Sequence, residues 1–467
     1  MPVSARITAT VATLILGAPV AHADVVISSG ATQNMTCSAG VCAPTSSDAV
    51  LNVSYLEALL ASGNVEVTTT GSGVQADSVS VGAALTWSST STLSLDAYGS
   101  IAIDRRVSVA GLSGMALTTN DGGSGGMLSF GPQGNVEFAS LASQLVINGV
   151  TYTLVGTIET LASDIAAAPS DNFALAADYD ASSDGEFAAP PIVTPFPGNL
   201  QGLGNSISHL KIAGHRHKLG AGLFAEIEGS VENVNLRRVD ISEKEQWGEA
   251  GGIAAYSQGL LSGIHVDGKI AGAADNAVGG VVGYNYGTIL ISSSTATIHG
   301  GEGSDCGGVV GLSRGTISQS FAGGAVGWDK GCQFAGGLVG ENLGTISNTY
   351  ATGGVIGGLY ETEGGGLIGE NDTQVSTSYS TGHVEAEYLG GFVGYQYSGS
   401  CSADCYWDTQ TSGTDLGAGY GNESNITGLA SKQLRSQLPA GLDPTIWAQD
   451  KKNNDGFPYL INNPPPK

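Results

Sequence analysis

A short cassette, two glycines followed by an apolar residue, recurs six times in the second half of the chain. The first glycines of successive cassettes lie 28, 28, 29, 29 and 25 residues apart. Self-similarity at a fixed period of about 20–50 residues is typical of proteins that stack one structural unit on the next. The cassette glycines are Gly251 and Gly252, Gly279 and Gly280, Gly307 and Gly308, Gly336 and Gly337, Gly365 and Gly366, and Gly390 and Gly391.

The residues between cassettes alternate with a period of two. One face of a strand is expected to carry Ile317, Gln319 and Phe321, and the same order returns at 346, 348 and 350 and at 375, 377 and 379. Period two with glycine punctuation predicts strands, not helices. The sequence therefore predicts an all-β, right-handed parallel β-helix (solenoid) with repeats of about 28 residues, its cassette glycines forming corners at positive φ. A β-propeller, whose blades need about 40 residues, is the weaker alternative.

One repeat carries a family resemblance. Residues 336–347, Gly-Gly-Leu-Val-Gly-Glu-Asn-Leu-Gly-Thr-Ile-Ser, resemble the GLUG repeat of secreted bacterial proteins, many of them similar to filamentous haemagglutinin. Residues 406–413 resemble the segment that closes such arrays, and residues 145–154 resemble the lead-in. The resemblance covers nearly the whole mature chain. It implies an adhesin-like role in cell adhesion and indicates no particular ligand.

The charge balance limits the possible partners. Seventeen basic residues face 42 acidic ones, a formal net charge of −25. Such a surface repels phosphate backbones and anionic lipids, so neither nucleic acid nor a membrane surface is an expected partner. No stretch after the N-terminal segment is long and apolar enough to cross a bilayer, so no transmembrane segment is expected in the mature chain.

Composition divides the chain into five segments. Residues 1–23 read as a signal peptide, with Arg6, an apolar run and an Ala-His-Ala cleavage site, and predict a secreted or cell-surface protein, with the periplasm as the alternative. Residues 24–150 are predicted to form irregular β-helix coils, and 151–221 a joint with a helix at 158–167 and a proline-rich loop. The GLUG-type array covers 222–410. Residues 411–467 are expected to be a cap, with Trp447 folding over the last coil, and a disordered tail.

The serines and histidines offer only weak catalytic motifs. Ser313 lies in a Gly-x-Ser-x-Gly match, but the same positions in neighbouring repeats hold turn residues, so a repeat turn is favoured over a nucleophile elbow and Ser313→Ala should change nothing. His215 and His217 lack a zinc-helix partner, and no cofactor is expected. The remaining histidines are expected to be solvated turn residues: His209, His265, His299 and His383.

Two charged clusters are candidate sites. A glycine-bearing loop gathers Asp178, Asp180, Asp184 and Glu186, a weak calcium-loop candidate whose spacing does not fit an EF-hand, so an ordinary acidic turn is favoured. The densest group for a polysaccharide-lyase site is Lys218, Arg237, Arg238 and Asp240. Because exposed positions in the best repeats are Ser, Thr, Asn and Gly, the sequence favours a protein that is not an enzyme.

Six cysteines fall into three near pairs. An even count in an exported chain favours disulfides, with zinc binding as the alternative. Local loops are expected from Cys37 with Cys42 and from Cys401 with Cys405. Because Cys306 and Cys332 are 26 residues apart, close to one repeat, they are expected to join neighbouring coils.

Three functions remain open. The first is a non-catalytic, adhesin-like solenoid that binds glycans or other surface molecules through ladders of polar and aromatic side chains. The second is a carbohydrate-active enzyme of parallel β-helix fold, which should bring three or more charged side chains together in one cleft. The third is a structural stalk or matrix component.

Overall fold

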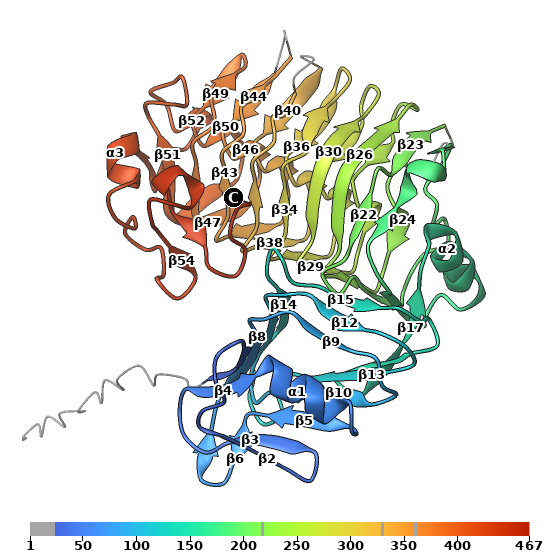
Figure 1. Cartoon of the computed structure of the whole chain (residues 1–467). Coiled ribbons are helices and arrows are strands. Elements are labelled where there is room, and N and C mark those ends of the chain that lie inside the picture. Colours follow the sequence, from blue (N-terminus) through green and yellow to red (C-terminus); the bar gives the residue numbers. More distant parts are fainter. Residues whose placement is uncertain (1–23, 216–218, 328–330, 359–361, 467) are drawn as a thin grey trace, which may run out of the picture.

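The computed structural model describes residues 24–466 except 216–218, 328–330 and 359–361; the expected signal peptide therefore lies outside the described residues. The described chain is nearly all β, and its strands stack in parallel into two solenoids (Figure 1). Each solenoid has its own apolar core, one built by residues 25–203 and the other by residues 155–426. The predicted parallel β-solenoid is confirmed. None of the helices in the described ranges has the length and hydropathy needed to cross a lipid bilayer.

The N-terminal solenoid consists of three parallel stacks of strands. The first runs β4-β1-β8-β11-β14, so the first strand of the chain lies inside the stack. Helix α1 (Val53–Leu60) buries Val53, Leu56 and Leu60 at the end of the stack β9-β12-β15. The bounds are β1 (Asp24–Ser28), β4 (Ala49–Asn52), β8 (Ser78–Val81), β11 (Ile101–Ile103), β14 (Leu128–Phe130); β9 (Leu85–Trp87), β12 (Val107–Val109), β15 (Val136–Phe138); and, in the third stack, β3 (Val41–Pro44), β5 (Val65–Thr68), β10 (Thr92–Asp96), β13 (Gly114–Thr118), β16 (Gln144–Ile147).

Two strands are shared by both solenoids. Strand β17 (Val150–Val155) turns back antiparallel on β16 and then pairs in parallel with β18 (Asn172–Leu175). In β18, Phe173 and Leu175 point into the C-terminal core, and Ala174 lies in the N-terminal core. Alternate side chains of a strand point to opposite faces, so this single strand contributes side chains to the end of one core and to the beginning of the next. The helix expected here is α2 (Ile158–Ala167), which covers the first coil of the C-terminal solenoid.

The C-terminal solenoid has three long parallel sheets. We name them the first, second and third sheet in the order in which the chain visits them within a repeat. The first sheet holds β27 (Glu249–Ala250), β31 (Ala277–Gly279), β36 (Ser304–Gly307), β40 (Cys332–Gly336), β45 (Glu363–Gly365) and β49 (Tyr388–Gly390). The second holds β24 (Phe224–Ile227), β28 (Ala254–Ser257), β32 (Val282–Asn285), β37 (Val310–Ser313), β41 (Val339–Asn342), β46 (Ile368–Asn371), β50 (Val393–Gln396) and β52 (Ala418–Gly421). The main strands of the third are β25 (Ser230–Glu232), β26 (Asn235–Glu243), β29 (Leu260–Ser262), β30 (His265–Ala271), β33 (Thr288–Leu290), β34 (Ser293–Ser294), β38 (Thr316–Ser318), β39 (Phe321–Ala322), β42 (Thr345–Ser347), β43 (Tyr350–Ala351), β47 (Gln374–Ser380), β51 (Ser400–Asp408) and β53 (Ile426–Leu429).

The coils extend beyond the predicted array of 222–410. Strand β18 already stacks in parallel below the third sheet, and β52 and β53 continue the second and third sheets as far as residue 429. The proline-rich loop is part of the stack as well, since Ile192 and Phe196 pair in parallel with Phe224 and Ile227 of β24. The sequence-based prediction did not include these coils in the array because they lack the glycine cassette.

The cassette glycines stack in register, but for a different reason from the one predicted. Gly279 pairs with Gly307, Gly307 with Gly336, and Gly336 with Gly365. None of the twelve cassette glycines has positive φ, so the corner explanation is wrong. Eleven of the twelve are instead packed against backbone, and the twelfth, Gly391, against the ring of Trp407; a Cβ on Gly336, for example, would collide with the carbonyl oxygen of Val339. Glycine is required because two strands approach too closely to leave room for a side chain.

Positive φ occurs elsewhere, at a bend in the third sheet. Gln319, Asn348 and Thr377 have φ of 47°, 51° and 46°. This left-handed bend interrupts the expected period-two strand, so Ile317 lies in the core but Phe321 lies outside it, in a separate cluster. The prediction that these two residues share a face is therefore wrong.

Polar side chains form buried ladders at two corners. The side-chain amide of Asn342 donates to Asn371 Oδ1 at 2.7 Å, and that of Asn371 donates to Gln396 Oε1 at 3.1 Å. At the bend, the backbone N–H of Ile264 donates to Ser292 Oγ at 3.2 Å, and that of Ser292 donates to Ser320 Oγ at 3.1 Å. Each coil thus satisfies the buried polar groups of its neighbour, as buried polar atoms require.

Trp447 of the C-terminal segment packs on the flank of the solenoid, beside Tyr350 and Tyr379, and not over the last coil as predicted. Phe321, Tyr350 and Tyr379 stack with ring centroids 4.8 and 5.2 Å apart, and Trp447 packs beside them. The expected disordered tail is held as well, because the side chain of Asn463 is buried and donates to the carbonyl oxygen of Ser292 at 3.0 Å. Figure 1 shows this segment, α3 (Ser431–Leu434) to the C-terminus, lying along the coils.

The six cysteines form the three disulfides expected from their spacing. Cys37–Cys42 bridges the hairpin β2 (Met35–Ser38)–β3, and Cys401–Cys405 lies within β51. Cys306–Cys332 joins β36 to β40 in the next coil, with the two Cα atoms 5.8 Å apart.

The close approach at the cassettes predicts that Gly337→Val destabilises the fold. A Cβ at Gly337 would overlap the carbonyl oxygen of Gly366 in the next coil and lie 2.8 Å from Ala351 Cβ, which belongs to the third sheet of the same coil. Overpacking of this kind costs about 1–3 kcal/mol and sometimes more. We expect a clearly lowered melting temperature in thermal unfolding. Gly354→Val is the matched control, because only one atom, at 3.8 Å, lies near its Cβ position. Equal melting temperatures for the two variants would contradict the packing explanation.

Candidate binding face

The residue five positions after the first cassette glycine forms a column on the second sheet. In register, this column reads Tyr256, Tyr284, Leu312, Glu341, Glu370 and Tyr395, and Tyr420 of β52 extends it. A facing column on the first sheet reads Asp305, Phe334, Glu363 and Tyr388. We call the surface formed by the two columns the binding face. It has tyrosines at both ends and carboxylates between them.

The first tyrosine cluster lies at the N-terminal end of the binding face. The rings of Tyr256, Tyr284 and Tyr286 contact one another with centroids 4.9–5.7 Å apart. Tyr284 OH donates to Tyr286 OH at 2.9 Å, and Arg314 Nε donates to Tyr284 OH at 2.7 Å. Tyr286 is 47% exposed. The cluster is thus a fixed aromatic platform, because its members are locked by rings and hydrogen bonds.

The second tyrosine cluster closes the other end. Tyr395 and Tyr420 stack with centroids 4.8 Å apart, and Tyr388 meets both rings edge-on at 6.4 Å. Tyr397 stacks on Tyr395 and is 69% exposed, and Tyr420 is 56% exposed. Large exposed aromatic side chains gathered in one patch are typical of recognition surfaces.

Carboxylates fill the space between the clusters, and their pKa values are raised. Burial, followed by the charges of Glu370, Asp372 and Glu341, raises the pKa of Glu363 to about 8. Burial, followed by Glu341 and Asp372, raises the pKa of Glu370 to about 7. Burial also raises the pKa of Glu341 and, well above its usual range, that of Asp305. Glu363 Oε2 is buried without a hydrogen-bond partner. Like charges in one column disfavour ionisation, so part of this group is protonated at neutral pH.

A polar groove runs beside the binding face at the corner between the second and third sheets. Its volume is about 610 Å³, within the range of about 300–1,000 Å³ that ligand sites occupy. The lining residues come from five successive coils: Gln258, Tyr286, Gly287, Thr288, Arg314, Gly315, Thr316, Leu343, Gly344, Thr345, Thr373 and Gln374. We call this the corner groove. Tyr286 belongs to both the groove and the first tyrosine cluster.

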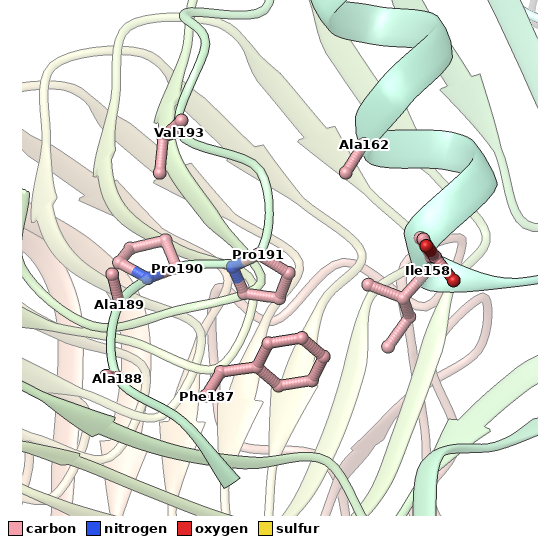
Figure 2. Close-up of a pocket in the computed structure, with 9 residues that line it drawn as sticks. Ile158, Ala162, Phe187, Ala188, Ala189, Pro190, Pro191 and Val193 are labelled. Atoms are coloured by element: carbon pink, nitrogen blue, oxygen red, sulfur yellow. The ribbon is translucent and has the colours of Figure 1, made fainter. Parts of the chain in front are cut away.

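A second hollow of about 350 Å³ lies at the joint between α2 and the proline-rich loop (Figure 2). Phe187, Pro190 and Pro191 face Ile158 and Ala162 of the helix across it. Glu159 supplies the only charge among its lining residues. Because it lacks convergent polar groups, it is a poorer candidate for a specific ligand than the corner groove.

Ser313 belongs to the buried polar ladder of the second sheet. It is fully buried at the end of β37, in register with Asn285 and Asn342. The side-chain amide of Asn285 donates to Ser313 Oγ at 3.2 Å. The structure therefore places Ser313 in a repeat turn and not at a strand-to-helix elbow.

The histidines predicted to be solvated differ from one another. His209 Nδ1 lies 2.9 Å from Asp180 Oδ1, and His383 Nε2 lies 3.6 Å from Glu385. His265 is half-buried in β30, with Nδ1 2.7 Å from Ser293 Oγ, and burial lowers its pKa to about 4. Its prediction as a turn residue is wrong. Among the described residues, no group of three His, Cys, Asp or Glu side chains could hold a metal; His217 lies outside them.

The carboxylates of the calcium-loop candidate do not converge. Asp178 accepts from the backbone N–H and hydroxyl of Ser206, at 2.7 and 2.9 Å. Asp184 accepts from Tyr179 OH, and Asp180 caps the turn at Ser182. The fourth acid, Glu186, lies in β20 (Glu186–Phe187) beside β23 (Lys211–Gly214). Three of the four carboxylates already accept protein hydrogen bonds.

The basic group proposed for a lyase lies outside both hollows. Arg237 and Asp240 are exposed on β26, and Arg238 occupies a bulge with φ of 52°. The backbone N–H of Arg238 donates to Asp267 Oδ1 at 2.6 Å. Lys218 lies outside the described residues.

Comparisons with known proteins add little. No family model and no curated protein matches the chain. One solved structure to which the fold is similar is the crystal structure of a putative immunoglobulin A1 protease from Bacteroides ovatus, with a TM-score of 0.43 and 16% identity over 67% of this chain and 93% of that one. The chain is therefore defined by its own fold, as a parallel β-solenoid protein.

The sequence contains a signal for the binding face. Aligning the cassettes places Tyr256, Tyr284 and Tyr395 at one repeat position, and Glu341 and Glu370 at the same position in the coils between. The repeat pattern consists of the residues that the repeats share, whereas the binding face is formed by a position at which they differ.

The ladder predicts that Ser313→Ala is destabilising, contrary to the sequence-based expectation that it changes nothing. Removal of the Ser313 hydroxyl leaves the buried side-chain amide of Asn285 without this acceptor, at a cost of about 1–2 kcal/mol in the free energy of unfolding. Chemical denaturation should show the loss. Ser313→Asn, which restores the residue of neighbouring rungs, should recover most of it. If Ser313→Ala unfolds like the unaltered protein, this ladder bond contributes nothing.

The raised pKa values predict that stability falls as pH rises. A carboxyl group protonated in the fold and ionised in the unfolded chain destabilises the fold above its unfolded pKa. For Glu363 and Glu370 the loss should develop between about pH 4.5 and pH 8. We expect a higher melting temperature at pH 5 than at pH 8, and a smaller difference in Glu363→Gln. Glu186→Gln, at an exposed position remote from the binding face, should leave the difference unchanged. A pH profile identical in all three proteins would contradict the assignment.

Proposed function

We propose that this protein is a non-catalytic, adhesin-like solenoid, secreted or displayed at the cell surface, that binds glycans through the binding face and the corner groove. The observation that supports this most is the pair of rigid, exposed tyrosine clusters. A tyrosine ring offers an apolar face to the C–H groups of a sugar and a hydroxyl to its oxygens. The resemblance of residues 336–347 to GLUG repeats of secreted bacterial proteins agrees with this role.

Glycan-array binding of the mature protein tests the proposal. We expect binding that falls about tenfold or more in Tyr286→Ala and in the double variant Tyr397→Ala/Tyr420→Ala, since truncating an aromatic anchor costs about 2 kcal/mol or more. Tyr55→Ala is the control, because Tyr55 is comparably exposed but lies on α1. If no glycan on a broad array binds, or if all variants bind alike, the proposal fails.

A second candidate, a glycan-cleaving enzyme, is favoured by the carboxylates of the binding face. A carboxyl group that stays protonated near neutral pH, as Glu363 does, can act as a general acid. Glycoside hydrolysis needs such an acid and a second carboxylate. Hydrolysis assays on the glycans found by the array decide between the two functions. Turnover that is abolished by Glu363→Gln, with binding retained, would establish the enzyme; absence of turnover leaves the binding protein.

A further inference from the structure

We propose that the corner groove holds an uncharged, linear polysaccharide lying parallel to the solenoid axis, with one sugar residue over each coil. This inference rests on the glycan-binding function proposed above and specifies the class of ligand. It is carried by the alignment of the groove across the coils, by its repeating hydroxyl groups, and by its charge.

The groove follows the stacking direction. Its polar wall is a single column, in which Thr288 pairs with Thr316, Thr316 with Thr345, and Thr345 with Gln374. Neighbouring strands lie about 4.8 Å apart, so a hydrogen-bonding side chain recurs at that interval. The repeat of an extended pyranose chain is close to this interval. A linear glycan along the axis therefore meets an equivalent donor and acceptor at each sugar.

Glycines keep the floor of the groove free of side chains. A Cβ at Gly287 would collide with the carbonyl oxygen of Gly259, and one at Gly315 with that of Gly287. Gly344 stands in the same relation to Gly315. The stacking of the coils thus excludes side chains from these positions. A flat channel remains between the residues that precede the glycines (Tyr286, Arg314 and Leu343) and the threonines that follow them. Tyr286, at one end of the channel, can stack on a sugar ring.

The hydroxyl groups of the wall are available to a ligand. Thr316 and Thr345 are exposed, and their Oγ1 atoms lie 3.1 Å apart. Each hydroxyl can donate one hydrogen bond and accept others, so this mutual contact leaves further capacity. Gln374 adds a side-chain amide on the next rung. A row of neutral donors and acceptors suits the hydroxyl groups of a sugar chain.

The charge of the groove favours an uncharged chain. Arg314 is the only charged residue among those lining it. Its Nε donates to Tyr284, and the charge of Glu341 acts on it from the binding face. The acidic surroundings, at a net charge of −25 for the chain, repel a polyanion.

Titration calorimetry with linear oligosaccharides of two to six sugars tests the inference. The probes are the gluco-, manno-, xylo- and N-acetylchito-oligosaccharide series, with polygalacturonate oligomers as the charged comparison. Because five coils line the groove, we expect at least one neutral series to bind more tightly with each added sugar up to about five and then level off. Polygalacturonate should bind at least tenfold more weakly.

Variants of the wall separate this inference from the proposed function. Thr316→Val and Thr345→Val keep the side-chain shape and remove the hydroxyl, so each should weaken binding of the five-sugar probe about two- to tenfold. Thr297→Val, at a threonine of β35 (Thr297–His299) that does not line the groove, should bind as the unaltered protein does. Circular dichroism and melting temperatures confirm that each variant is folded.

Two results would overturn the inference and leave the proposed function standing: affinity that stops rising at one or two sugars, and glycan binding that the tyrosine variants abolish but the threonine variants do not change. Tighter binding of polygalacturonate than of every neutral series would also overturn it. Absence of binding to any glycan would remove the inference together with the proposed function.

Discussion

The structure depends on one close contact, the backbone-to-backbone approach of the first and second sheets. Cassette glycines such as Gly307 face the second sheet, and Gly311 and Gly340 of the second sheet face the backbone of the first. From β31 and β32 onward both columns are glycine, because a Cβ at these positions would meet main-chain atoms of the facing sheet, whereas Ala255 occupies the corresponding position in β28. This close approach brings the columns that begin at Asp305 and Tyr256 to one surface. The binding face is therefore a direct consequence of the glycine contact.

Stacking in register turns every repeat position into a column, and the column decides what each side chain experiences. Stacking stabilises columns of apolar or amide side chains, because like neighbours pack together or form hydrogen bonds, as Asn342 and Asn371 do. Stacking destabilises a column of carboxylates. Glu341 and Glu370 are neighbours in one column, and burial together with the nearby negative charges raises their pKa values. Such a column therefore lowers the stability of the fold at neutral pH. This is the behaviour expected of residues kept for recognition or chemistry.

The left-handed bend has a similarly far-reaching effect. At Gln319, Asn348 and Thr377 it reverses the side-chain alternation, so Phe321, Tyr350 and Tyr379 point out of the solenoid. An aromatic column of this length would be an exposed apolar patch. The C-terminal segment covers it, with Trp447 against the rings and Asn463 hydrogen-bonded to the carbonyl oxygens of Ser292 and Gln319. The segment is thus part of the fold, although it has none of the repeat's sequence pattern.

The sequence by itself determined the period, the strand character and the register, because glycine spacing and period-two alternation are local properties that backbone pairing must obey. It also indicated the three cysteine pairs, since their separations match a hairpin, one coil and a short loop. It did not determine which columns reach the surface. That depended on the bend at Gln319, where the residue type does not predict a left-handed φ. It also depended on the cassette glycines, which are needed for close contact with another sheet and not for a positive φ. The tyrosine and carboxylate columns became a candidate site only when the tertiary structure set two sheets face to face.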